Sequence, residues 1–463
     1  MLLEPSRPRA VREHRMAGWF AVGTVCFGAF MGQLDASIVT LTFPALQTEF
    51  HAPLAAVEWV SLSYLLALVG LVAAAGRVAD AAGRKLVYLG GFAVFTAASA
   101  ACALSPSLGW LIGFRVVQAV GAAMLQANSV ALVVTSVPRA KMRAALGVQA
   151  AAQALGLALG PALGGLLVAS VGWRWVFWVN VPVGIVAMVA GRYMLPRTRQ
   201  RTGLGRFDWP GLLLLAGATT VFLVGLSGFS GLPLPAWAAA ALVLVSVALL
   251  LVFVLRERRA ANPLVDLEAL RPRAVSVGLL GALCAYLVLF GPLALFPQVL
   301  GAHGSGGLVL TALPAGFAVA AVLAEPVLPP RWSARRRGLI GGGLCLVALS
   351  ALVALPTRPG WAAGWLLALG LGLGLFIPAN NSAIMAAFSP STAGSGGGLV
   401  NMARSLGTAL GVAVVTLSLH LADTNGLGSG SQSGARPALL ALLAFAAATT
   451  ATAGAARRFT EPR

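Results

Sequence analysis

A series of long apolar segments, repeated from one end to the other, most constrains what this chain of 463 residues can fold into. Fourteen segments approach or exceed the length of about 20 apolar residues that a helix needs to cross a bilayer. They span residues 19–41, 59–79, 86–104, 108–135, 144–169, 175–195, 209–228, 237–255, 274–300, 308–328, 339–355, 361–388, 399–419 and 437–456. Only 10% of the residues are charged, whereas soluble proteins carry about 25%. This pattern excludes a soluble enzyme or a nucleic-acid-binding module and predicts an all-α polytopic membrane protein.

The positive charges are distributed unevenly among the connections between these segments. The chain carries 32 Lys and Arg residues against 13 Asp and Glu residues, a net charge of +19. With both termini in the cytoplasm, 27 of the positive residues fall on the cytoplasmic side and only Arg174, Arg358 and Arg436 on the other. Because positive residues favour the cytoplasmic side, we expect both termini to lie there. The excess of Arg over Lys is typical of GC-rich bacterial genomes, which predicts a multi-pass protein of the bacterial inner membrane.

Two short sequences occur twice at nearly the same spacing. LGLALGPA at 155–162 returns as LGTALGVA at 406–413, 251 residues later, and NS at 128–129 returns as NS at 381–382, 253 residues later. This repeat predicts two six-helix halves around a central site, an architecture typical of secondary transporters. Twelve helices would preserve the charge distribution as well, so a count of fourteen depends on the segments at 209–228 and 237–255. The expected units are a tail at 1–16, a bundle at 17–196, a linker with two extra helices at 197–258, a bundle at 259–456 and a tail at 457–463.

Eight short motifs follow one another in a fixed order. They read LDASIV at 34–39, GRVADAAGRK at 76–85, RVVQAVGAA at 115–123, GPALGG at 160–165, WRWVF at 173–177 with NVP at 180–182, FDWPG at 207–211, PLVDL at 263–267 and NMARSLG at 401–407. This series resembles the fourteen-helix drug:proton antiporter branch of the major facilitator superfamily. Ala81 and Ala119 depart from the family pattern, which has a basic residue and a glycine there. The resemblance implies a major facilitator fold with two six-helix bundles plus an inserted two-helix hairpin.

Acidic and basic residues within the apolar segments are the candidates for proton coupling. A carboxylate such as Asp35 is costly at mid-membrane depth, so we expect it to face the protein interior and to exchange a proton as access alternates. Arg115 is the other buried charge, and the resemblance assigns its counterpart a role in proton transfer. Glu325 is either a further proton or substrate site or an interfacial partner of nearby arginines. Glu58 is expected to be a solvated residue at the outer start of its helix.

Two further groups carry expected roles in conformational change. The resemblance implies a gate at the connection after the second segment, in which Asp80 contacts helix eleven or the loop near Arg143. The gate residues are Gly76, Asp80, Gly83, Arg84, Lys85 and Arg143. The second group lies at helical spacing on one face of the fifth segment, where small residues let two helices approach closely. It comprises Gly156, Gly160, Pro161, Gly164 and Gly165.

Polar side chains at mid-membrane depth are expected to line a substrate cavity, because an unpaired polar group there costs several kcal/mol. The expected lining residues are Gln33, Gln118, Gln126, Asn128, Gln149, Gln153, Asn380, Asn381, Asn401 and Arg404, with Met31 and Met124 as an adaptable apolar wall. Arg404 would either bind an anion or pair with an acid across the bundle.

These observations predict a monomeric, proton-coupled exporter of amphipathic small molecules, with protons and the lipid bilayer as its other partners. It would need no cofactor beyond the proton gradient and no metal, and it would bind no nucleic acid. The alternative within transport is a gradient-independent facilitator or an importer of a specific metabolite. A membrane-embedded enzyme or sensor is disfavoured because the sequence contains no catalytic Ser/His/Asp set, metal-ligand cluster, phosphate loop or soluble domain.

Overall fold

The computed structural model describes residues 7–138, 141–198, 208–260, 265, 267–300, 306–329, 332–355, 359–388, 393–428 and 432–455. All the regular elements within these ranges are helices. The first half contains α1 (Arg9–Arg12), α2 (Ala17–Ile38), η1 (Val39–Thr42), α3 (Phe43–Phe50), α4 (Leu54–Val57), α5 (Trp59–Ala82), α6 (Arg84–Ala103), α7 (Leu108–Ser136), α8 (Met142–Ser170), α9 (Arg174–Trp178) and α10 (Asn180–Met194). Then come α11 (Trp209–Phe229), α12 (Ala236–Glu257), η3 (Glu268–Leu270), α13 (Arg273–Leu300), α14 (Gly306–Val327), α15 (Ala334–Ala354), α16 (Pro359–Ala386), α17 (Ala393–Thr424) and α18 (Gln432–Ala455).

Each of the fourteen apolar segments coincides with a helix or a pair of consecutive helices. Thirteen helical stretches in the described residues are long and apolar enough to cross a membrane. The remaining segment falls on α14, whose apolar part, Val309–Ala324, is shorter. The fold is therefore the all-helical polytopic architecture that the sequence predicts.

The first membrane segment is less regular than its sequence predicts. Its α-helix ends at Ile38, three residues after Asp35, and continues as the 3₁₀ helix η1 before α3 begins. Pro44 occupies the first turn of α3, where its missing N–H costs nothing. A single residue also joins α5 to α6, and this residue, Gly83, has a φ of 118°. A side chain at that backbone angle would be strained, which accounts for the glycine.

The two halves pack by the same rule. In the first half, α8 lies against α2, and in the second, α17 lies against α13. A methyl group added at Gly156 would collide with the Phe30 carbonyl of α2, and one at Gly407 with the Leu283 carbonyl of α13. These glycines are the pair related by the 251-residue spacing. The sequence repeat therefore corresponds to two equivalent helix seams.

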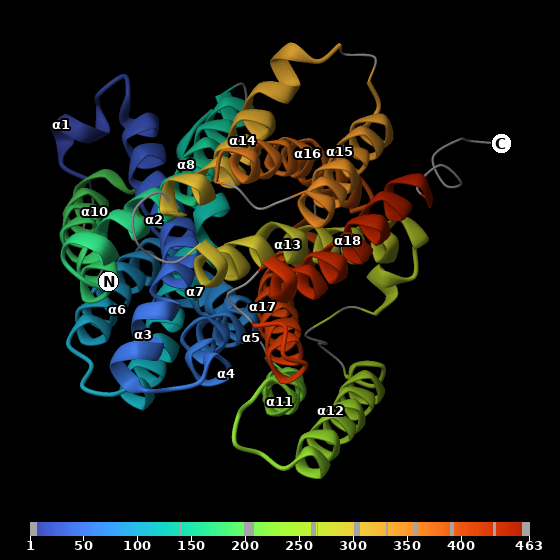
Figure 1. Cartoon of the computed structure of the whole chain (residues 1–463). Helices are drawn as coiled ribbons and strands as arrows, with labels where there is room; N and C mark the ends of the chain where they lie inside the picture. The colour runs from blue at the N-terminus through green and yellow to red at the C-terminus, as the bar shows by residue number, and fades with distance from the viewer. Residues whose placement is uncertain are drawn as a thin grey trace.

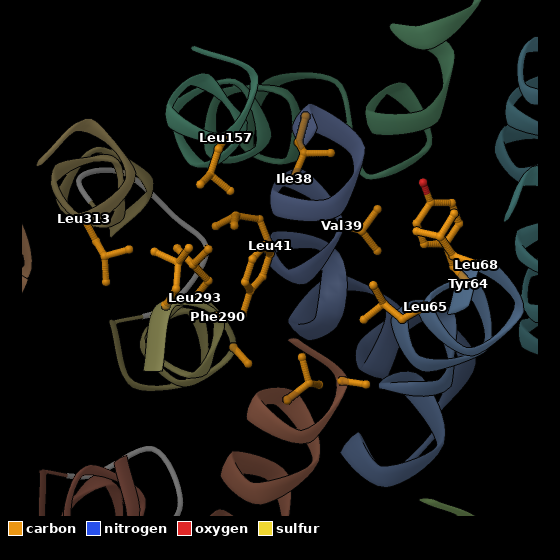
Figure 2. Packing of buried hydrophobic residues seen from close by; sticks show 14 of the residues in the cluster. Ile38, Val39, Leu41, Tyr64, Leu65, Leu68, Leu157, Phe290, Leu293 and Leu313 are labelled. Carbon is orange, nitrogen blue, oxygen red and sulfur yellow. The ribbon is translucent and has the colours of Figure 1, made fainter. Parts of the chain in front are cut away.

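Figure 1 shows the blue-to-green first half and the yellow-to-red second half on either side of the molecule, with α8 and α14 side by side where they meet. Apolar side chains fill part of this interface. Leu41 of the first half lies close to Phe290 and Leu293 of α13 (Figure 2), and all three are buried.

The inserted pair, α11 and α12, lies at the edge of the molecule beside α17 (Figure 1). Helix α11 contacts α4, α5 and α17, whereas α12 packs mainly on α11. At the start of α11, Asp208 accepts hydrogen bonds from the Gly211 N–H, at 3.1 Å, and from Arg256 at the end of α12, at 2.8 Å. Burial raises the pKa of Asp208, but these hydrogen bonds outweigh it and hold the pKa below the usual range of aspartate. The pair is thus joined at one end by a capped helix start and an ion pair.

Candidate transport site

A central cavity lies between the two halves. Its walls come from α2, α5, α6, α7 and α8 of the first half and from α13 and α17 of the second. The polar lining residues are Gln33, Tyr64, Gln126, Ser129, Gln153, Arg404, Ser405 and Thr408. Apolar side chains such as Leu65, Phe95 and Phe290 form much of the remainder. This mixture suits a molecule that has both an apolar body and a few polar groups.

A buried ion pair lies in the first half, behind one wall of this cavity. Asp35 on α2 and Arg115 on α7 are both almost completely buried, and Oδ2 of Asp35 lies 2.6 Å from Nη1 of Arg115. Gln118, one turn along α7, accepts from Arg115 at 2.6 Å and donates to Oδ1 of Asp35 at 3.0 Å. Asn180, at the start of α10, donates to the same oxygen at 3.3 Å. The pair is therefore embedded in a polar network that joins three helices.

Arg115 is also held by α5. Its Nε donates to the Val60 carbonyl at 2.9 Å, and its guanidinium carbon lies 4.1 Å from the centre of the Tyr64 ring. Tyr64 lines the cavity, whereas Asp35 and Arg115 do not. The Tyr64 ring thus connects the cavity to the ion pair. The sequence indicated that Asp35 faces the protein interior, but it contained no signal for the position of Tyr64.

The structure divides the expected cavity residues into several groups. Gln33, Gln126, Gln153 and Arg404 line the cavity. Asn401 does not line the cavity. Its side-chain oxygen accepts a hydrogen bond from Gln126 at 3.2 Å, and this bond joins α7 of one half to α17 of the other. Gln118 belongs to the ion-pair network instead.

The other expected lining residues lie away from the cavity, where they support the surrounding helices. Asn128 bonds the Met124 carbonyl within its own helix, and Asn380 bonds the Gly278 carbonyl. Asn381 hydrogen-bonds Tyr286 of α13, as does Arg404 from the cavity wall. Met31 is buried in the core, Gln149 is buried in α8, and Met124 packs partly buried against the core. Helical depth alone did not indicate which way these side chains point.

The expected gate residues occupy two different positions. Asp80 pairs with Arg84 across the α5–α6 turn, with 3.0 Å between Oδ1 and Nη2, and in the described residues it makes no hydrogen bond to helix eleven, α15. Lys85 is buried, and its ammonium donates to the Arg192 and Leu195 carbonyls at 2.8 and 3.0 Å. It therefore caps the end of α10, because carbonyls there lack helical partners. The side chains of Arg143 and Glu325 lie outside the described part of the chain, and Gly76 and Gly83 sit at the end of α5.

The glycine face of α8 packs on α2 close to the ion pair. A methyl group at Gly160 would collide with the Ser37 side chain, and one at Gly164 would lie 2.8 Å from Ile38. Pro161 lies inside the helix, and Gly165 is buried next to Gly164. This seam therefore fixes the helix that carries Asp35.

Glu58 is the clearest correction to the sequence-based expectation. It is not a solvated residue: its side chain is completely buried, and Oε1 accepts a hydrogen bond from Ser227 of α11 at 2.7 Å. The expectation was wrong because α4, α11 and α17 cover the start of α5. Position near a helix end indicates depth in the membrane, but not what other helices cover that end.

Comparisons with known proteins agree with this architecture. Residues 25–412 match the family model described as Major Facilitator Superfamily. The chain is 32% identical to a tetracenomycin C resistance and export protein of Streptomyces glaucescens, over 86% of this chain and 75% of that protein. It is 30% identical to a riboflavin transporter of Clostridioides difficile, over 85% and 87% of the two chains. Among solved structures, a peptide transporter bound to alafosfalin is similar in fold, with a TM-score of 0.70, 13% identity and coverage of 99% and 98%. The chain therefore belongs to the Major Facilitator Superfamily and is a multi-pass membrane transporter rather than an enzyme.

Proposed function

We propose that this protein is a proton-coupled exporter of amphipathic small molecules that works by alternating access. It would function as a monomer in the bacterial inner membrane with both termini in the cytoplasm. Its energy would come from the proton gradient, without a cofactor. The similarity to an antibiotic export protein supports the direction of transport.

The observation that carries the proposal is the Asp35–Arg115 pair behind the Tyr64 wall of the cavity. In this conformation a charge-assisted hydrogen bond of 2.6 Å joins Asp35 to Arg115. A proton arriving on Asp35 would remove one charge of the pair and leave Arg115 buried without a counter-ion, a costly state. The helices must then rearrange to supply Arg115 with new partners or water. Proton binding and helix position are thus linked through the same two side chains.

The cavity supplies the other side of this link. A substrate against Tyr64 and Gln33 would touch the ring under Arg115 and the helix that carries Asp35. It could therefore favour a different arrangement of the ion pair from the one that binds a proton. If the protein cannot hold substrate and proton in the same conformation, then each must leave before the other binds, and the two are exchanged across the membrane.

The second candidate function is transport of a specific metabolite without proton coupling or in the inward direction. The similarity to a riboflavin transporter supports this second function, because riboflavin is a specific metabolite. The two functions differ in one measurable respect, which is the dependence of flux on a proton gradient.

Proton release from purified protein tests the coupling directly. Tetracenomycin C, riboflavin or ethidium would be added to lightly buffered protein with a pH indicator. We expect wild type to release protons with at least one probe, and Asp35→Asn to release none while still binding it. Glu13→Gln, which removes an exposed carboxylate, should behave like wild type.

Two results would count against the proposal. Equal proton release from wild type and Asp35→Asn would place the coupling elsewhere. Flux in proteoliposomes that does not respond to a pH gradient would exclude antiport and favour the facilitator. Asp35→Asn combined with Arg115→Gln provides a second variant without a buried unpaired charge.

A further inference from the structure

Glu58 lies where three parts of the molecule meet. It stands between α4 and α5 of the first half, and its partners belong to the inserted helix α11 and to α17 of the second half. Contacts of α4 with α17 and of α3 with α13 show that the halves are closed against each other at this end of the bundle. By the charge distribution, this is the end that faces outward.

The hydrogen bonds around Glu58 run in one direction. The Trp59 indole donates to the Ser227 hydroxyl at 3.2 Å, and that hydroxyl donates to Oε1 of Glu58 at 2.7 Å. Thr416 lies beside the carboxyl, and its own hydroxyl donates to the Val412 carbonyl at 3.2 Å. The Thr416 oxygen is thus left able to accept a hydrogen bond, while Oε2 of Glu58 is buried and accepts none. A proton on Oε2 would complete the chain.

The charged groups near Glu58 do not neutralise it. None of the residues of α4 or α11 is charged. On α17, His420 lies one turn beyond Thr416, against Gly231, and Asp423 is exposed. From α7, Arg115 reaches α5 at the Val60 carbonyl but is occupied by Asp35. Among the described residues Glu58 therefore forms no ion pair, and an unpaired buried carboxylate is strongly disfavoured.

We propose that Glu58 is a second proton-binding residue, and that its proton holds α5, α11 and α17 together on the outward-facing side. In the closed seam the carboxyl is neutral, donating to Thr416 and accepting from Ser227. When the halves separate, water reaches the carboxyl, which releases its proton to the solvent and becomes an anion. Closure in turn requires that a proton be taken up. The inserted pair has a role in this device, because α11 supplies the Ser227 hydroxyl.

Distance measurements across the seam test the proposal without a transported substrate. Spin labels would be attached at Thr48→Cys in α3 and Asn425→Cys after α17, both exposed positions. Double electron–electron resonance between pH 5 and 9 would then measure the distance between the two halves. We expect the ratio of closed to open molecules in wild type to fall as pH rises, by up to about tenfold per pH unit for one linked proton. Glu58→Gln, which is neutral at every pH, should stay closed with less than a roughly twofold change.

Four further variants separate the possible origins of a pH response. Glu49→Gln removes a half-exposed acid on the same side, paired with Arg174, and should respond like wild type. His420→Gln should also respond like wild type, as should Asp35→Asn, because Glu58 acts independently of the proposed coupling pair. Glu58→Asp should retain the response at a shifted midpoint. A wild type without pH response, or an unchanged response in Glu58→Gln, would overturn the proposal, and loss of the response only in Asp35→Asn would assign it to the ion pair.

Discussion

Arg115 is held by polar and aromatic partners from two neighbouring helices and from its own helix. Its guanidinium bonds Asp35, Gln118 and the Val60 carbonyl and lies over the Tyr64 ring. Such a fork of donors cannot be reproduced by a single ammonium group. Neutralising one partner of a buried pair costs about 3–5 kcal/mol, because the other charge remains buried.

This arrangement predicts a rescue in a double-mutant cycle. Asp35→Asn and Arg115→Gln should each lower the free energy of unfolding by about 3 kcal/mol, and the double variant should lose less than the sum by about 2 kcal/mol or more. Reversible unfolding in detergent measures the four proteins. Strictly additive losses would show that the two charges do not interact.

Arg404 presents a cation to the cavity, and in the described residues it pairs with no acid, its hydrogen bond going to Tyr286 instead. We therefore expect it to favour anionic ligands. Arg404→Gln should weaken binding of 1-naphthoate about tenfold or more, the value of a charge-assisted hydrogen bond, and change 1-naphthamide binding little. Tryptophan fluorescence titration measures both. Arg258→Gln, which removes an exposed arginine, is the control; equal weakening of both ligands by Arg404→Gln would contradict the expectation.

At this scale the sequence predicted that Asp35 and Arg115 are buried charges, but not that they are partners. Asp35 and Arg115 stand out because few ionisable residues occur inside apolar segments. Their contact could not be derived, because depth along two helices leaves the rotation of each helix undetermined. For the same reason Gln118 was assigned to the cavity and Glu58 to the solvent.

At the scale of elements, the seam between α2 and α8 is the feature most sensitive to added volume. Gly160→Ala would push a methyl group into Ser37, and overpacking of this kind costs about 1–3 kcal/mol. Gly147→Ala, in the same helix, meets nothing within 4 Å and should be neutral or stabilising by up to about 1 kcal/mol, because alanine is the better helix former. Thermal unfolding of both variants checks this, and equal behaviour would show that the seam tolerates volume.

The boundaries of most elements followed from apolar length, as in α7 and α16, because bilayer thickness dictates how long a spanning helix must be. The break after Ile38 did not follow from it. Residues 39–42 are as apolar as the helix before them, and the change to a 3₁₀ helix leaves no mark on hydropathy. The glycine spacing in α8 predicted a close approach, but only packing shows that the neighbour is α2.

At the scale of the whole molecule, the charge distribution predicts the orientation in the membrane. Thr48→Cys, on the side of α3, should react with an impermeant maleimide in intact cells. Arg258→Cys, after α12, should react only after permeabilisation. Cys102, Cys284 and Cys345 are buried, and the half-buried Cys26 is replaced by Ser in the background protein to keep native labelling low. The opposite labelling pattern would reverse the assigned topology.

The architecture as a whole was the most predictable property, because hydropathy, charge asymmetry and the 251-residue repeat depend on the bilayer and on duplication rather than on side-chain detail. The cavity was less predictable. Its walls combine helices from both halves, and the sequence of one helix does not show how that helix is rotated relative to the others.

The paired glycine seams also have a consequence for how the gene tolerates change. Gly156 and Gly407 each face a backbone carbonyl of the neighbouring helix, as Gly160 faces Ser37 and Gly411 the Leu287 carbonyl. If every position were substituted and the fitness measured, we therefore expect the positions of α8 that tolerate no side chain to have counterparts 251 residues later in α17. Substitution of one apolar residue by another on the lipid-facing side of α12 should change fitness very little. We expect the two halves to diverge less at these glycines than at the lipid-exposed positions around them.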